Sequence, residues 1–189
     1  MGKQSKGRGD TMKKVIFKCK LKSRDAFEQK LSDINMDFGP VYWQHDRVYV
    51  PRTYKKSANF PRLIMRTEVK ALDRPARYDL ILKRHIEDSG IDIENVTSVR
   101  DYTEVVNIIH QLGFEKKAEV SRKRQELSLG TDTKIYIDNI EGLVGFYAKI
   151  ETVLDEDDKV SEVKAQLLKT LEVLGEHNIV DETYADLLS

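Results

Sequence analysis

The chain has a single cysteine, Cys19, four prolines among 189 residues, and no apolar run that approaches the ~20 residues needed to span a bilayer. One cysteine excludes an internal disulfide framework and is typical of a reducing compartment. The first 14 residues are basic and lack the apolar stretch of a secretory signal. We therefore expect a cytoplasmic protein with no membrane partner.

The chain also has no net charge, since 32 Lys and Arg residues balance 32 Asp and Glu residues. Neutrality argues against a general nucleic-acid coat, but charge can still be segregated along a neutral chain. Residues 1–24 hold nine Lys or Arg and one acid, whereas residues 155–189 hold ten acids and three lysines. A nucleic-acid partner is thus an alternative that the composition does not favour, and no oligomeric state is predicted.

The length predicts one domain. Residues 1–12 are rich in Gly, Lys and Ser without periodicity, so we expect a disordered tail or a remnant of cloning. Residues 13–189 are expected to form the single folded domain, which is long enough to bury a substantial core.

Apolar and charged residues alternate along several segments, which is typical of half-buried β-strands. We predict strands at 15–22, 42–50, 62–70, 77–86, 119–129, 134–140 and 146–154. Helical spacing of apolar residues follows Ser23 and recurs at 101–113, after the acidic run 155–158, and at 181–188. The pattern therefore predicts an α+β fold built on antiparallel strands.

The charged faces of these strands carry rows of like charge. Lys18, Lys20 and Lys22 alternate without an intervening acid, and paired arginines recur on two later strands. A sheet with one solvated face is the ordinary explanation. If the sheet instead closes into a barrel, these faces meet in a basic lumen suited to phosphate oxygens, which arginine binds bidentately and lysine as a point charge. Both interpretations stay open on the pattern alone.

Several motifs in the second half follow one another in a distinctive order. Leu-Gly-Phe at 112–114 precedes Val-Ser-Arg-Lys-Arg at 120–124, Ile-Asp-Asn-Ile-Glu-Gly-Leu at 137–143 and Gly-Phe-Tyr-Ala-Lys-Ile-Glu at 145–151. Together with the segments 44–49, 63–66 and 82–83, they resemble the CYTH superfamily, the triphosphate tunnel metalloenzymes. That family includes class IV adenylate cyclases, thiamine triphosphatases and inorganic triphosphatases. The resemblance runs from about Lys13 to Leu188.

The resemblance implies a closed antiparallel β-barrel, the triphosphate tunnel, with helices packed outside it. Its lumen would bind a triphosphate, a polyphosphate or another polyanion. The residues expected to contact the anion are Lys18, Lys20, Lys22, Arg62, Arg66, Lys83, Arg122, Arg124 and Lys149.

The resemblance also implies Mg²⁺ or Mn²⁺ as cofactor in an active enzyme, and here the sequence departs from the family. We match the family's first-strand Glu-x-Glu-x-Lys to Lys18-Cys19-Lys20-Leu21-Lys22, so that two lysines replace the metal-binding glutamates. Lys149 replaces one of two glutamates on the last strand and leaves Glu151. Ammonium groups do not bind hard cations. Asp138 and Glu151 remain as candidate metal ligands or, as we favour, as partners of the lysines.

We therefore predict a CYTH-like tunnel protein that binds a nucleotide, an organic triphosphate or inorganic polyphosphate, with metal-dependent catalysis weakened or lost. The first alternative is an active metal-dependent triphosphatase or class IV adenylate cyclase. The second is a non-enzymatic scaffold or a nucleic-acid-associated protein that uses the basic N-terminal segment.

Overall fold

The computed structural model describes residues 11–54, 60–71, 73–86 and 89–189. Most of the expected tail, residues 1–10, lies outside the described residues, and the first strand begins at Met12, the last residue assigned to that tail. Within the described residues there are eight strands and four helices. The strands are β1 (Met12–Lys20), β2 (Tyr42–Pro51), β3 (Arg62–Val69), β4 (Arg77–Ile86), β5 (Ile91–Ser98), β6 (Phe114–Leu129), β7 (Thr133–Ile140) and β8 (Phe146–Val153). The helices are α1 (Arg24–Ser32), α2 (Tyr102–Gln111), α3 (Val160–Val173) and α4 (Tyr184–Leu187).

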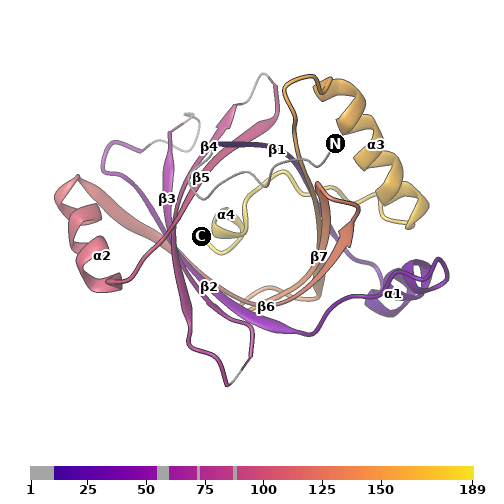
Figure 1. The fold of residues 1–189 in the computed structure, drawn as a ribbon, viewed down its shortest axis with the longest axis horizontal. Helices are drawn as coiled ribbons and strands as arrows, with labels where there is room; N and C mark the ends of the chain where they lie inside the picture. Colours follow the sequence, from indigo (N-terminus) through magenta and orange to yellow (C-terminus); the bar gives the residue numbers. More distant parts are fainter. Residues whose placement is uncertain (1–10, 55–59, 72, 87–88) are drawn as a thin grey trace, which may run out of the picture.

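The strands form a closed antiparallel barrel in the order β1-β5-β4-β3-β2-β6-β7-β8. Figure 1 looks into this ring. Two meanders, β2 to β5 and β6 to β8, are joined along β2 and β6, and β1 closes the gap between β5 and β8. Closure brings the charged faces of the strands together inside, so the barrel interpretation is confirmed and the open sheet is not.

The sequence-based assignment missed one strand, β5. Its residues alternate between the two faces, with Ile91 and Ile93 in one phase and Asp92 and Glu94 in the other, as a half-buried strand should. β5 pairs with β4 along its whole length and with the start of β1. Without β5 the ring could not close.

Most of the hydrophobic core lies between the outer face of the barrel and the helices. Val15, Cys19, Ile135 and Ile150 are fully buried in one cluster with the inner face of α3. A second cluster places Tyr49 and Met65 beneath α2. Two of the apolar clusters therefore lie outside the barrel under helices. A third, with Val48, Val120 and Ile140, lies inside it against Tyr184 of α4, so the lumen has apolar as well as charged walls.

Helices α1, α2 and α3 lie outside the ring, as expected, but α4 does not (Figure 1). After α3 the chain runs beside the end of β1, where Val180 N donates to Lys18 O at 2.8 Å. It then enters the barrel mouth, and Tyr184 and Ala185 of α4 are buried. Among the described residues, no helix combines the length and apolarity required to cross a membrane.

Candidate functional site: a charged lumen

The barrel encloses a cavity of about 860 Å³. It is lined by alternate residues of all the strands and by the C-terminal segment that carries α4. Carboxylates line it as well as cations, so the lumen is not basic throughout, contrary to the sequence-based expectation. The positions of the charges relative to one another therefore decide what the cavity can bind.

Seven of the nine predicted anion-binding residues line this cavity: Lys18, Arg62, Arg66, Lys83, Arg122, Arg124 and Lys149. The other two do not. Lys20 is exposed at the end of β1, and Lys22 lies beyond that strand and is also exposed. Met12, Lys14, Ile16 and Lys18 of β1 line the cavity, so the lumenal part of the strand begins six residues earlier than expected.

Lys14 is thus a lumen residue that the sequence analysis missed. The match of Lys18 and Lys20 to the family's two first-strand glutamates therefore puts one of the two outside the cavity, whereas Lys14, Ile16 and Lys18 line it. The alternation of Val15 and Phe17 with these residues already contained the signal. Lysines at alternating positions on both sides of Lys18 made the register ambiguous.

Two arginines share one carboxylate on the β2–β3–β6 side of the lumen. Arg66 donates to Asp46 through Nε at 2.7 Å and Nη2 at 2.8 Å. Arg122 donates to Asp46 Oδ2 at 2.6 Å and also to Gln44 Oε1. Burial opposes the charge of Asp46, but the two guanidinium groups outweigh it and hold its pKa well below the usual range. Burial, together with Arg124 and Arg66, lowers the pKa of Arg122.

Arg124 forms a separate bidentate pair with Asp138. Both guanidinium–carboxylate distances are 2.6 Å, and Asp138 is completely buried. Tyr184 of α4 donates its hydroxyl to Asp138 Oδ2 at 3.0 Å. Burial and the nearby Asp138 charge raise the pKa of Tyr184. Both oxygens of Asp138 are therefore already engaged by the chain itself.

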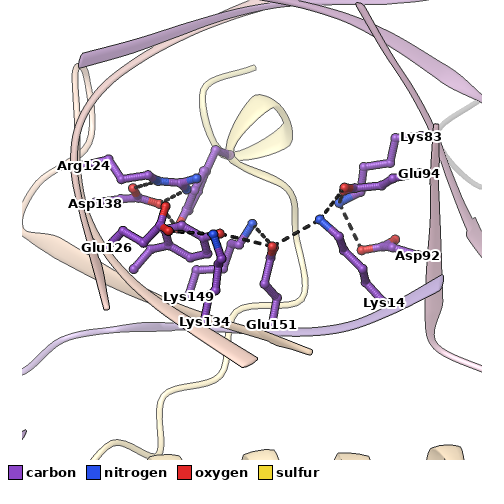
Figure 2. Close-up of polar contacts among 12 residues, drawn as sticks. Lys14, Lys83, Asp92, Glu94, Arg124, Glu126, Lys134, Asp138, Lys149 and Glu151 are labelled. Atoms are coloured by element: carbon purple, nitrogen blue, oxygen red, sulfur yellow. Dashed lines mark hydrogen bonds and ion pairs between the residues drawn. The ribbon is translucent and has the colours of Figure 1, made fainter. Parts of the chain in front are cut away.

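Lysines predominate on the opposite side of the lumen, where they bridge carboxylates. Lys14 Nζ lies 2.8 Å from Glu94 Oε2 and 3.1 Å from Glu151 Oε1, and Figure 2 shows it between these two side chains. Lys83 Nζ lies 3.1 Å from both Asp92 and Glu94, and Lys149 Nζ lies 2.5 Å from Glu151 Oε2. We call this group the lysine–carboxylate network: Lys14, Lys83, Lys149, Asp92, Glu94 and Glu151.

The network shifts the pKa values of its members. Burial disfavours a charged Glu94, but Lys83 and Lys14 reverse this and lower its pKa to about 2. For Lys149, burial is the larger effect and is reinforced by Arg124 and Lys83, so its pKa falls to about 8 despite the attraction of Glu151. Lys149 therefore loses its proton at a lower pH than an ordinary lysine does.

Lys18 lies near the mouth that α4 occupies. Its ammonium group donates to the backbone carbonyl of Glu182 and lies 5.7 Å from the centre of the Tyr184 ring. In the part of the chain that the structure describes, Lys18 forms no ion pair with a carboxylate. Burial and the charge of Lys83 lower its pKa to about 8.

Two further cations, one of them in the lumen, hold the C-terminal segment in the barrel mouth. Arg62 donates to Thr183 Oγ1 at 3.0 Å and lies 3.4 Å from Asp186. Lys117 pairs with the same aspartate. The sequence analysis did not anticipate these contacts, because nothing in the residues 181–188 distinguishes a helix in a barrel from one on the surface.

The predicted metal ligands are not brought together. Asp138 is paired with Tyr147 across the β7–β8 ladder, whereas Glu151 is paired with Lys134. The four-residue offset corresponds to about 13 Å along the strands. Searched over the described residues, no group of three or more His, Cys, Asp or Glu side chains could hold a metal ion. Asp138 and Glu151 instead pair with cations, and the residues present do not fit Mg²⁺ or Mn²⁺.

No family model matches the sequence, and no curated protein matches it. Solved structures do resemble the barrel. PH1819 from Pyrococcus horikoshii is 22% identical with a TM-score of 0.79, over 93% of this chain and 97% of that one. The adenylyl cyclase candidate HpAC1 from Hippeastrum, whose structure is described as revealing a dominant triphosphatase activity, is 15% identical with a TM-score of 0.61, over 94% of each chain.

A third likeness is to a chain in the structure of the Schizosaccharomyces pombe Mediator head module. It is 15% identical with a TM-score of 0.62, over 90% of this chain and all of that chain. At such identities a likeness describes the fold alone. Together with the eight-stranded closed ring, these likenesses show that this chain shares an antiparallel barrel fold with those proteins.

Proposed function

We propose that this chain binds a triphosphate-class anion in its lumen without a divalent metal. The anion would be a nucleotide, an organic triphosphate or a short inorganic polyphosphate. The main support is a local excess of positive charge among lumen side chains whose charges otherwise balance. Lys18, Lys149 and Arg122 all have lowered pKa values, because each is buried beside other cations. A bound anion would relieve that repulsion.

The arrangement of the cations suits phosphate oxygens. Asp46 serves both Arg66 and Arg122, so each of these guanidinium groups keeps further N–H donors for a ligand. Lys18 adds a charge that is not neutralised by a described carboxylate. A cavity of about 860 Å³ falls within the range of small-molecule sites. Arginine would orient the ligand, and lysine would contribute charge without fixed geometry.

The antiparallel barrel fold adds support, since HpAC1, which shares it, is described as a triphosphatase. Catalytic turnover requires more than binding of the anion. Polarising a phosphoryl group and activating water are roles that metal ions perform in many phosphoryl-transfer enzymes. The lumen carboxylates of this chain are engaged by lysines and arginines, so we propose binding with metal-dependent catalysis weakened or lost.

The proposal is tested by titrating tripolyphosphate into the native chain in the presence of EDTA. We expect binding by calorimetry and a rise in melting temperature, with ATP as a second probe. Lys18→Ala should weaken binding roughly tenfold, equivalent to about 1.4 kcal/mol. Lys20→Ala is the matched control, because Lys20 leaves the same strand on the exposed side, and it should bind as the native chain does.

Proton uptake provides a second readout of the same titration. Near pH 8 Lys18 is about half protonated. An anion beside it raises its pKa, so binding should take up protons, seen as a binding heat that depends on the buffer's ionisation enthalpy. Failure of both tripolyphosphate and ATP to bind in EDTA would disprove the proposal. Binding and phosphate release that both require Mg²⁺ or Mn²⁺ would instead establish the active-enzyme alternative.

A non-enzymatic scaffold is the second candidate. It is favoured by the closure of one barrel mouth by α4, which Arg62, Lys117 and Asp138 all hold in place. The occurrence of this fold in the Mediator head module structure shows that such barrels also exist in large assemblies. In this case the lumen charges would serve only to hold the barrel and α4 together, and no phosphate compound would stabilise the chain.

A further inference from the structure

The geometry of the lysine–carboxylate network is that of a cation site. Glu94 belongs to β5 and Glu151 to β8, and these strands are separated in the ring by β1. Their carboxylates nevertheless converge on one point, the ammonium nitrogen of Lys14, at 2.8 and 3.1 Å. All three side chains are nearly buried, with 12%, 11% and 8% of Lys14, Glu94 and Glu151 exposed.

Two carboxylates held close together in a buried site repel one another, and a cation between them is needed to compensate this repulsion. Here that cation is part of the chain, and Lys149 supplies a second one on the far side of Glu151 (Figure 2). Glu151 Oε2 lies 2.5 Å from Lys149 Nζ, yet among the described residues it accepts no hydrogen bond of acceptable geometry. Oε1 faces Lys14 at 3.1 Å, so each oxygen of this carboxylate lies against a different ammonium group.

We propose that the ammonium groups of Lys14 and Lys149 stand in for a divalent cation at this position, so that the chain carries its counter-cation covalently. The inference relies on the proposed function in one respect only, which is the identity of the anion that binds near the network. The cation position itself follows from the convergence of Glu94 and Glu151 on Lys14. It also accounts for the disagreement between the metal dependence that the family resemblance implies and the residues found here.

The proposal has a direct consequence. Two ammonium groups and one divalent ion carry the same charge, so either can balance these carboxylates while an anion binds nearby. Hard divalent cations bind carboxylate oxygens and not ammonium groups. Replacing Lys14 with glutamate should therefore convert the network from one that excludes Mn²⁺ to one that binds it, with Glu94 and Glu151 as the other ligands.

The test is Mn²⁺ binding by electron paramagnetic resonance, which counts free ion and requires no catalysis. We expect no measurable binding to the native chain and a Kd of ~1 mM or below for Lys14→Glu, comparable to weak protein sites for divalent ions. Mn²⁺ should also raise the melting temperature of that variant. Lys20→Glu is the matched control, since it makes the same charge change on the same strand outside the cavity.

Lys149→Glu guards against a folding failure of the first variant, because it places the new carboxylate on the other side of Glu151. The inference is overturned if the native chain binds Mn²⁺ as tightly as the variants do. It is also overturned if a folded Lys14→Glu or Lys149→Glu variant gains no more Mn²⁺ than Lys20→Glu. Gain of Mn²⁺ without tripolyphosphate binding to the native chain would retain the cation position and reject only the proposed function.

Discussion

The two sides of the lumen neutralise charge in different ways. On the arginine side, formed by Arg66, Arg122, Arg124, Asp46 and Asp138, Arg66 and Arg124 each pair bidentately with one carboxylate. In the lysine–carboxylate network, Lys14 and Lys83 each bridge two carboxylates, and Glu94 and Glu151 each contact two lysines. The first arrangement consists of bidentate couples, one of which also accepts a hydrogen bond from Arg122, and the second of ammonium groups shared between carboxylates.

The difference follows from the chemistry of the side chains. A planar guanidinium matches a carboxylate edge to edge, so removing either partner leaves an uncompensated charge. An ammonium group is a compact charge with three donors and can be shared without one preferred partner. The arginine side should therefore depend strongly on single residues, whereas the network should redistribute its charges when one member is lost.

The largest expected effect is that of Asp138→Ala on the arginine side. It leaves the guanidinium of Arg124 buried without its partner and also removes the acceptor of the Tyr184 hydroxyl. Breaking a buried pair in this way costs about 3–5 kcal/mol of unfolding free energy. Urea denaturation followed by circular dichroism measures it.

Glu126→Ala is the control for that measurement. It removes the partner of Lys134, whose side chain is 41% exposed, so the ion pair is screened by solvent. Glu126 also accepts a hydrogen bond from the Tyr42 hydroxyl at 3.2 Å, so the variant should cost about 1–2 kcal/mol, less than Asp138→Ala. If Asp138→Ala cost no more than Glu126→Ala, the arginine side would not depend strongly on single residues as argued above.

Lys14→Met should have a smaller effect. Methionine keeps most of the aliphatic stem, and Glu94 and Glu151 retain Lys83 and Lys149 respectively. We expect a loss of about 1–3 kcal/mol, the size of a hydrogen bond to a charged group. A loss as large as that of Asp138→Ala, in the same urea experiment, would mean that Lys14 acts as an indispensable partner and that the network does not share its charges.

Much of the fold could be predicted from sequence because alternation reports directly on a two-faced strand. Seven strands were placed in this way, and the helices that begin at Ser23 and Asp101 start where their side chains accept hydrogen bonds from the backbone. β5 was missed although Asp92 and Glu94 alternate with isoleucines. The position of α4 inside the barrel could not be predicted, because it depends on Asp138 and Arg62, which lie far from it in the sequence.

The site was predicted less completely for a related reason. Whether a residue faces the lumen depends on the alternation within its own strand. Seven of the nine expected anion contacts do face the lumen. Which carboxylate pairs with which cation depends on register between strands, as with Glu94 and Glu151, whose convergence on Lys14 crosses three strands. Lys20 and Lys22 were placed inside because alternation alone does not show where β1 leaves the barrel.

The smallest predicted effect is the contribution of Lys149, a member of the network, to the dependence of stability on pH. Lys18, whose pKa is also about 8, contributes in the same direction. Lys149 has a pKa of about 8 in the folded chain against 10.5 when unperturbed. Between these values the unfolded chain binds more protons, so the contribution of Lys149 to stability rises with pH, by at most ~1.4 kcal/mol per pH unit. Below about pH 8 the lysine is charged in both states and the contribution is constant.

Cys19 acts in the opposite direction above about pH 9, because burial raises its pKa to about 12 in the folded chain. Comparison with Lys149→Met cancels that contribution, since both proteins retain the cysteine. The difference in unfolding free energy between native and Lys149→Met chains should shift in favour of the native chain as pH rises from 7.5 to 9.5, measured by urea denaturation at constant ionic strength. A difference that stays flat over this range would show that Lys149 is fully neutralised by Glu151, and that the network, like the arginine side, consists of closed pairs.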